Sequence, residues 1–320
     1  MAMAENFQIV RSRMDKAATG ARASVAAGFF DGVHLGHAGV LGAALGAARA
    51  SGAEPWVFTF EAHPRAVLAP GGAPPPLLCP PWRRIALFRE MGFAGVVLAE
   101  FDATLASLPP EDFASRLKVT FPGLEMFRCG ENWRFGRNGA GTAPMLVRLA
   151  AERGFEAKPV PMARYLGEPI SSTRIRAAVA AGDLAAAAAM LGRPFSISGK
   201  VARGRQVGSA NGVATANIPT NGLATPPNGV YAVRAAVRGE RFGGVADLGW
   251  RPTFHDARPD SPILEVHLFG FDSELYGQDI DVEFRGFIRG EVEFRTKDEL
   301  FAQIARDCAT AQKLLLYSKA

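Results

Sequence analysis

The first half of the chain alternates short apolar runs with longer amphipathic segments. The apolar runs predict buried strands at 24–30, 56–60, 95–99 and 125–129, and a weaker strand near 158–161. The segments between them predict helices at 34–50, 83–91, 111–119, 144–153 and 173–181. Strands that alternate with helices form βαβ units, so this pattern indicates an α/β fold with a parallel sheet and helices on both faces. Functional sites of such folds lie at the carboxyl ends of the strands.

The pattern changes after Pro194 to short strands in which apolar and polar residues alternate. These strands are predicted at 196–201, 230–237, 243–248, 263–269 and 281–284, and Asn-Gly turn signals at 211–212, 221–222 and 228–229 separate several of them. The spacing predicts a small antiparallel β-barrel. A C-terminal helix is predicted from 297 to about 315, where apolar residues recur at helical spacing: Leu300, Phe301, Ile304 and Cys308.

Two further segments indicate the domain organisation. The proline- and glycine-rich stretch 70–81 predicts a loop. The alanine-rich run 177–191, interrupted by Gly182-Asp183, predicts two short helices with the domain junction at their end. A length of 320 residues suits two domains. We place these domains at 1–185 and 186–320.

The net charge of +5 raises the question of a nucleic-acid partner. The 36 basic residues are interspersed with 31 acidic ones, whereas nucleic-acid binders concentrate basic residues in a patch or arm. We therefore expect no nucleic acid; the small excess also suits an enzyme that handles polyphosphates. The sequence has no membrane-length apolar run, no signal-peptide pattern and no cysteine spacing typical of disulfide or CxxC sites. These features predict a cytoplasmic protein without a membrane partner and leave a homo-oligomer open.

The strongest local signal is Gly28-Phe-Phe-Asp-Gly-Val-His-Leu-Gly-His37, which follows a strand and opens a helix. His34 and His37 lie three residues apart, so they project from one face of the first helical turn, and Gly36 allows a ligand to approach the backbone. A helix N-terminus favours phosphate, and two imidazoles can bind a nucleotide α-phosphate as it becomes five-coordinate. A surface histidine pair and a partial zinc site are the alternatives, although no nearby residue at ligand spacing completes a zinc shell.

The segment Ile-Ser-Ser-Thr-Arg-Ile-Arg at 170–176 gives a second phosphate signal. A serine caps the predicted helix, and Arg174 and Arg176 lie in its first turn, where positive charge opposes the helix dipole. A bound anion would remove this conflict; arginines that extend into water are the alternative. Two further segments at strand ends, 59–65 and 130–141, are weak signals on their own.

The second half carries candidate residues for a metal and a general base. The basic, glycine-rich segment 199–208 lacks the Walker spacing. If the chain after it is extended, Thr215 and Asn217 share one face and offer a hydroxyl and an amide oxygen to hydrated Mg²⁺. Glu265 and His267 also share one face of a predicted strand. Glu265 is therefore either a general base or a solvated strand residue.

Together these motifs resemble those of the bifunctional prokaryotic riboflavin kinase/FAD synthetases, from about residue 20 to the C-terminus. The N-terminal module resembles their Rossmann-like adenylyltransferase domain, an HxGH nucleotidyltransferase, at 28–37, 60–65, 130–136 and 170–176. The C-terminal module resembles their flavokinase barrel at 191–201, 215–217, 227–231, 251–254, 264–267, 275–277 and 287–289.

The resemblance implies a two-step flavin enzyme: riboflavin and ATP give FMN, and FMN and ATP give FAD and pyrophosphate, with Mg²⁺ as cofactor. It implies that His34 and His37 stabilise the α-phosphate during attack by FMN. It also implies that Thr215 and Asn217 coordinate Mg²⁺-ATP, and that Glu265 takes the proton from the ribityl 5′-hydroxyl. ATP or phosphate binding is implied for Gly28, Phe30, Asp31, Gly36, Asn132, Ser172, Arg176, Gly199, Lys200, Gly204 and Gly208.

The chain departs from the family pattern mainly in the second module. Ala214 stands where proline is usual, Ser209 where arginine is frequent, and Asp247-Leu-Gly where Asn-Ile-Gly is common. In the first module Phe-Glu-Ala-His-Pro at 60–64 replaces Phe-Asp-Pro-His-Pro. An FAD synthetase with a weak kinase half is therefore one alternative, and a flavin-binding regulator that has lost the chemistry is another.

Overall fold

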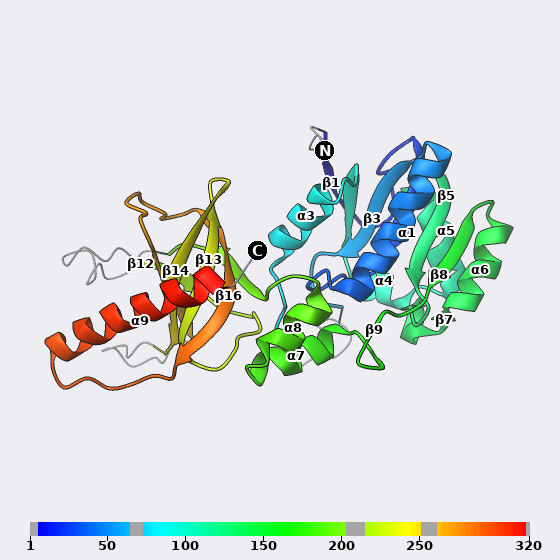
Figure 1. Cartoon of the computed structure of the whole chain (residues 1–320). Helices are drawn as coiled ribbons and strands as arrows, with labels where there is room; N and C mark the ends of the chain where they lie inside the picture. The colour runs from blue at the N-terminus through cyan, green and yellow to red at the C-terminus, as the bar shows by residue number, and fades with distance from the viewer. Residues whose placement is uncertain (1–5, 65–72, 203–214, 251–260, 318–320) are drawn as a thin grey trace. The chain divides into compact units, whose positions relative to one another are not determined.

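The computed structural model describes residues 6–64, 73–202, 215–250 and 261–317 (Figure 1). The chain divides into two compact units. Unit 1 comprises Met1–Pro75 and Pro81–Ser172, and unit 2 comprises Pro76–Pro80 and Thr173–Ala320. Each unit has hydrophobic clusters of its own, as a domain requires. The domain limits 1–185 and 186–320 stay a prediction.

A parallel sheet forms the centre of unit 1, with its strands in the order β1-β4-β3-β2-β5-β8. These strands are β1 (Gln8–Ser12), β2 (Arg22–Ala27), β3 (Glu54–Phe60), β4 (Gly95–Ala99), β5 (Gly123–Gly130) and β8 (Glu156–Val160). Every residue of β4 is buried, as expected for a strand that is covered on both faces. The parallel α/β arrangement predicted from the alternating pattern is therefore present.

Helices cover both faces of this sheet: α1 (Leu35–Ser51), α3 (Pro81–Glu90), α4 (Ala103–Ser107), α5 (Pro110–Thr120) and α6 (Ala143–Glu152). One hydrophobic cluster joins the sheet to α1 and α3, and the other joins it to α5 and α6 (Figure 1). Side chains alternate along a strand, so β3 contributes Trp56 and Phe58 to one cluster and Val57 to the other.

Several elements of unit 1 differ from the sequence prediction. The strand expected over 24–30 spans Arg22–Ala27, and Phe30, which lies within the expected range, has a left-handed backbone with φ of 56°. The helix expected from His34 begins at Leu35, and His34 is its N-cap. Shorter elements were not predicted: β1, α4, β6 (Arg134–Phe135), η1 (Arg137–Gly139), β7 (Gly141–Thr142), β9 (Arg164–Tyr165) and β10 (Glu168–Pro169).

Unit 2 contains an antiparallel sheet with its strands in the order β11-β16-β13-β14-β15-β12. These strands are β11 (Ser196–Lys200), β12 (Thr215–Pro219), β13 (Gly229–Val237), β14 (Glu240–Gly249), β15 (Ile263–Leu268) and β16 (Asp279–Arg289). A bridge from Ala202, just after β11, to Asn217 on β12 joins the two ends of the sheet. The sheet is therefore a nearly closed barrel, as the spacing of the strands predicted.

Three helices accompany the barrel: α7 (Ser172–Ala180), α8 (Leu184–Leu191) and α9 (Lys297–Tyr317). The buried residues of α9 are Asp307, Ala311 and Leu315, which lie four residues apart on one face. Phe301, one of the apolar residues that recur at helical spacing in the sequence, is exposed. Contact between α9 and the barrel is therefore made by the C-terminal half of the helix, against Val230, Ala232 and Val245.

The expected loop at 70–81 contributes to unit 2. Residues 70–72 lie outside the described residues, and α3 begins at Pro81. In between, Leu77 forms a bridge with Leu223: its N–H donates to the Gly222 carbonyl at 2.7 Å, and its carbonyl accepts from the Ala224 N–H at 2.8 Å. A segment from the first half of the chain thus joins the second unit.

Candidate functional site

Motif residues of unit 1 follow three neighbouring strands of its sheet. β3, β2 and β5 are parallel, so their carboxyl ends lie at one edge. His63 follows β3, the segment from Gly28 to His34 follows β2, and Asn132 follows β5. The rings of Phe29 and His63 meet edge-on with centroids 4.6 Å apart, which brings the first two segments into contact. This edge is where an α/β fold carries its ligand site.

The loop from Gly28 to His34, here called the histidine loop, has an unusual backbone. Phe30, Gly32 and Val33 have φ values of 56°, 79° and 41°. Aromatic and β-branched residues rarely adopt this region; such strain costs on the order of 1–3 kcal/mol per residue and concentrates at functional sites. The Val33 N–H donates to the Phe30 carbonyl at 3.0 Å, which closes the turn.

His34 and His37 lie side by side at the start of α1. The backbone N–H of His37 donates to Nδ1 of His34 at 3.3 Å, and the rings stack with centroids 3.5 Å apart and 17° between their planes. Because Nδ1 of His34 accepts a hydrogen bond, its ring proton lies on Nε2, which is therefore a donor. His34 is buried and His37 half-buried, with Phe30 edge-on to the His37 ring.

Residues 170–172, where α7 begins, contact the histidine loop and the start of α1. The Ser172 hydroxyl donates to the backbone carbonyl of the buried Asp31 at 3.1 Å. A Cβ on Gly36 would lie 3.1 Å from Cε1 of His34 and 3.5 Å from the Ile170 carbonyl oxygen. Glycine at this position therefore permits the close approach of two motif segments, 28–37 and 170–176.

The remaining candidate residues of the first half are more exposed. Asn132 is exposed after β5, whereas Arg174 and Arg176 are half-buried; Arg174 lies in the first turn of α7 and Arg176 just after it. Cys129, one residue before the end of β5, is fully buried, and burial raises the pKa of its thiol to about 12. A thiol with so high a pKa is not a nucleophile. The chemistry available at this edge is therefore hydrogen-bond donation and positive charge directed at an anion.

A polar row crosses the barrel sheet of unit 2. Asn217 on β12 pairs with Glu265 on β15, which pairs with Asp247 on β14. Directly opposed residues project to the same face of a sheet. Glu265 and His267 are half-buried and alternate with buried Leu264, so the row lies on the face opposite the barrel interior. The predicted sharing of one face by Glu265 and His267 is confirmed.

Thr215 belongs to the same face, because it lies two residues before Asn217 and pairs with His267. Thr215 is exposed and Asn217 is buried. The Thr215 hydroxyl and the Asn217 amide oxygen therefore belong to the same face of the sheet as the Glu265 carboxylate. No group of three His, Cys, Asp or Glu that could hold a metal occurs among the described residues.

Asp247 adds a second carboxylate beside Glu265. It keeps contact with solvent, but desolvation raises its pKa to about 6, and the charges of Glu265 and Glu291 act in the same direction. Arg289 lowers the pKa and Asp307 raises it. The face is therefore strongly acidic, with Arg289 as the opposing charge.

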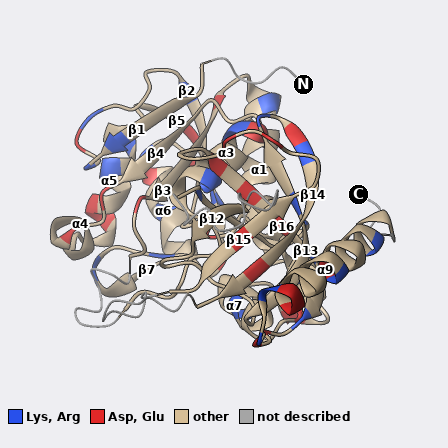
Figure 2. Ribbon diagram, turned by 90° about the vertical axis from the view of Figure 1, so that its left-hand side faces the viewer, with Lys and Arg blue, Asp and Glu red and all other residues tan. Residues whose placement is uncertain are grey.

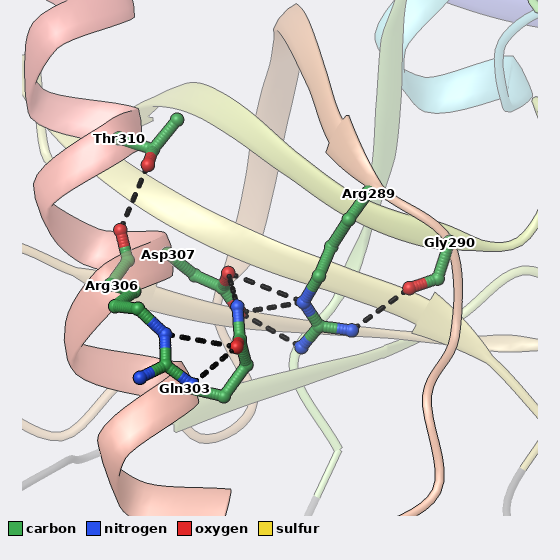
Figure 3. Close-up of polar contacts among 6 residues, drawn as sticks. All are labelled: Arg289, Gly290, Gln303, Arg306, Asp307 and Thr310. Atoms are coloured by element: carbon green, nitrogen blue, oxygen red, sulfur yellow. Dashed lines mark hydrogen bonds and ion pairs between the residues drawn. The ribbon is translucent and has the colours of Figure 1, made fainter.

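Arg289 joins the barrel to α9 (Figure 3). Its Nε lies 3.2 and 3.0 Å from the two carboxylate oxygens of Asp307, and its Nη2 lies 2.8 Å from one of them. Gln303 donates to the same carboxylate at 2.8 Å, and Arg289 Nη1 donates to the Gly290 carbonyl at 2.8 Å. Since Asp307 is only 4% exposed, this ion pair is an anchor of α9 beside the polar row.

The expected phosphate loop of the second half is described only at its start. Gly199 lies in β11, where a Cβ would come 2.6 Å from Ile218, so glycine allows β11 and β12 to pack closely. Lys200 donates to the Gly277 carbonyl at 3.0 Å and lies 3.6 Å from Asp279. The predictions for Gly204 and Gly208, and the departures at Ser209 and Ala214, fall outside the described residues.

Basic and acidic residues are interspersed in the structure, as they are along the sequence. Figure 2 shows Lys and Arg interspersed with Asp and Glu along the ribbons. Within the described part of the chain, no helix is both long enough and apolar enough to cross a membrane.

Comparison with known proteins covers both halves of the chain. The family model of FAD synthetase matches residues 16–174, and that of riboflavin kinase matches residues 191–315. A bifunctional riboflavin kinase/FMN adenylyltransferase from Bacillus subtilis is 36% identical over 90% of both chains. One from Escherichia coli is also 36% identical, over 91% of this chain and 92% of its own.

A solved structure shares the fold. The crystal structure described as a macrolide-efflux protein from Streptococcus pneumoniae has a TM-score of 0.78 and 27% sequence identity, and it covers 93% of this chain and 97% of its own. With the two family models and the curated relatives, this likeness extends over both units. The chain belongs to the family of bifunctional riboflavin kinase/FMN adenylyltransferases, transferases that join a kinase to a nucleotidyltransferase.

Proposed function

We propose that the two halves of this bifunctional enzyme catalyse successive ATP-dependent steps at separate sites. The second half phosphorylates riboflavin to FMN, and the first half adenylylates FMN to FAD. The observation that carries the proposal is the stacked pair of His34 and His37 at the N-terminus of α1, on a strained loop at the carboxyl edge of a parallel sheet. This arrangement is suited to an anion whose charge increases during reaction.

The first half is proposed to act as a Rossmann-like HxGH nucleotidyltransferase. A phosphate oxygen of FMN attacks the α-phosphorus of ATP, the bond to the oxygen that bridges the α- and β-phosphates breaks, and pyrophosphate leaves. His34, through Nε2, and His37 donate hydrogen bonds to the α-phosphate, and the amide end of α1 adds partial positive charge. No covalent enzyme intermediate is needed, so catalysis rests on positioning and charge neutralisation. The remaining ATP-binding residues are proposed as Gly28, Phe30, Asp31, Gly36, Asn132, Ser172 and Arg176.

The second half is proposed to use Glu265 as its general base. Glu265 accepts the proton of the ribityl 5′-hydroxyl as that oxygen attacks the γ-phosphorus of ATP, and ADP leaves. Its half-buried position beside Asn217, on the face opposite the barrel interior, supports this role. The segment from Gly199 and Lys200 to Gly204 and Gly208 is proposed to bind the phosphates of ATP.

We further propose that Thr215 and Asn217 hold Mg²⁺ in the kinase half. A bound Mg²⁺ supplies charge neutralisation on the phosphates of ATP. The residues of the chain fit this ion, because Thr215 and Asn217 offer a hydroxyl and an amide oxygen from one strand, β12.

One assay tests the proposed function. Riboflavin is incubated with Mg²⁺-ATP and the full-length protein, and the flavins are separated by chromatography. The proposal expects FMN and FAD. FAD formed only from supplied FMN would favour an FAD synthetase with a weak kinase half. If neither FMN nor FAD is formed, the result would favour a flavin-binding regulator.

A further inference from the structure

Arg84 of α3 is an arginine buried to 1% exposure. Its Nη1 donates to the Phe29 carbonyl at 2.8 Å, and its Nη2 donates to the Phe60 carbonyl at 2.7 Å. The guanidinium carbon also lies 4.6 Å from the centroid of the Phe29 ring. Burying a charged side chain is costly unless its donors are satisfied. A specific requirement of the surrounding structure must therefore keep an arginine at this position.

The two hydrogen bonds of Arg84 join the segments that leave β2 and β3. The Phe29 carbonyl also accepts from the Thr59 hydroxyl at 3.1 Å. Phe60 is the last residue of β3 and precedes the segment that contains His63, whose ring meets Phe29 edge-on. Arg84 therefore fixes the distance between two motif-bearing segments at the carboxyl edge of the sheet.

The strained part of the histidine loop begins one residue after Phe29. The buried ring of Phe30 lies edge-on to Phe88 of α3, with centroids 5.8 Å apart, and to His37, at 5.3 Å. Phe88 follows Arg84 by four residues, so both side chains project from the same face of α3. On this face of α3, Arg84 contacts Phe29 and Phe88 contacts Phe30. Phe30 in turn contacts the His37 ring.

We propose that Arg84 is a positioning residue of the adenylyl-transfer site. By binding the Phe29 and Phe60 carbonyls together, it holds the histidine loop in the strained conformation that orients His34 and His37. The inference rests on the adenylyl transfer proposed for the first half. The planar fork of a guanidinium can donate to two separate carbonyls at once, whereas a lysine ammonium is a point charge that lacks this fork.

Two substitutions separate the effect of the planar guanidinium of Arg84 from that of its positive charge. Arg84→Lys keeps the charge and removes the fork, and Arg84→Met removes both. Because a displacement of about 1 Å can cost about 10²-fold in rate, Arg84→Lys is expected to lower kcat of FMN adenylylation by about ten- to a hundredfold. The KM values for ATP and FMN should change by less than about twofold, since ground-state binding is retained. Riboflavin phosphorylation by the same preparation should be unchanged, and Arg84→Met should be at least as impaired in adenylylation.

Two control variants identify a general loss of stability. Arg83→Lys alters the neighbouring arginine, whose ion pair with Glu90 is 2.7 Å long. Phe93→Leu weakens the same hydrophobic cluster, because Phe93 is fully buried and packs against Phe88 with centroids 6.4 Å apart. Both controls should retain the wild-type kcat of adenylylation, even where Phe93→Leu lowers the melting temperature.

The outcomes distinguish the inference from the function on which it rests. A wild-type kcat in Arg84→Lys overturns the positioning role, and so does a loss that Phe93→Leu reproduces at equal melting temperature. A raised KM with unchanged kcat also overturns it, because that result means lost uniform binding rather than lost orientation. Absence of FAD synthesis in the wild-type chain refutes the proposed function itself, and the inference with it.

Discussion

Asp307→Asn tests how much one buried ion pair contributes to the attachment of α9. In the wild type the Asp307 carboxylate accepts from Arg289 and from Gln303 (Figure 3). Asp307, Ala311 and Leu315 are the buried positions along one face of the helix. The substitution removes the charge but keeps the shape, so the guanidinium remains between barrel and helix without its carboxylate.

The expected loss in free energy of unfolding follows from the burial of the two partners. The side chain of Asp307 is 6% exposed and that of Arg289 is 21% exposed. Breaking a fully buried pair by removing one partner costs 3–5 kcal/mol, and the partial exposure of Arg289 places the expected loss near the lower limit, at about 3 kcal/mol. Replacing both residues, as in Arg289→Met with Asp307→Leu, removes both charges and should recover most of this loss.

The assay is inactivation by urea, with the riboflavin kinase and FMN adenylyltransferase activities of the same sample followed in parallel. Asp307→Asn should lower the urea midpoint of kinase loss and leave the midpoint of adenylyltransferase loss in place, since the pair lies within unit 2. The double variant should return the kinase midpoint toward the wild-type value. A double variant as unstable as the single one would refute the reasoning, because the cost would then not come from an unpaired charge.

Three further predictions concern the assignment of the two chemistries. His37→Ala should lower FAD synthesis by about 10²–10³-fold, as the loss of one oxyanion-hole donor does; FMN synthesis measured in the same sample should persist, and normal FAD synthesis would remove the histidine pair from the mechanism. Glu265→Gln should lower riboflavin phosphorylation by about 10²–10⁴-fold with flavin binding little changed; a full kinase rate would identify Glu265 as a solvated strand residue. A fragment spanning Thr173–Ala320, which contains all of unit 2 except Pro76–Pro80, should phosphorylate riboflavin, whereas one starting at Pro194 also lacks α7 and α8 and should be less stable; equal thermal stability of the two fragments would contradict this.

Most of the longer helices and strands could be predicted because they have a local signal. β4 is an uninterrupted apolar run and was predicted with its observed limits, since a strand buried on both faces needs only apolar residues. The edge strand β1 lacks that signal, because most of its side chains are exposed. The short helix α4 begins at a capping Asp102 but has only five residues, too few for a hydrophobic period to develop.

The positions of the candidate residues could be predicted only in part. His34 and His37 were recognised from their spacing, and Asn217 and Glu265 from the faces of their strands. The hydrogen bond from Ser172 to Asp31 spans 141 residues, and no periodicity indicates such a contact. Within the expected loop at 70–81, residues 73–80 lack a helix or strand, as predicted, yet the bridge from Leu77 to Leu223 depends on how distant segments of the chain meet.

Arg84 shows why a functional motif is easier to predict than its supports. A motif such as the histidine loop is local, so its residue types and spacing predict the chemistry directly. Its strained backbone, however, needs partners that local sequence cannot supply, and here they come from α3, from β3 and from Ser172, the first residue of α7. An arginine in an amphipathic helix is ordinarily solvated, so the sequence gives no reason to bury it. The burial of Arg84 is explained only by the structure, in which one guanidinium donates hydrogen bonds to both the Phe29 and the Phe60 carbonyl.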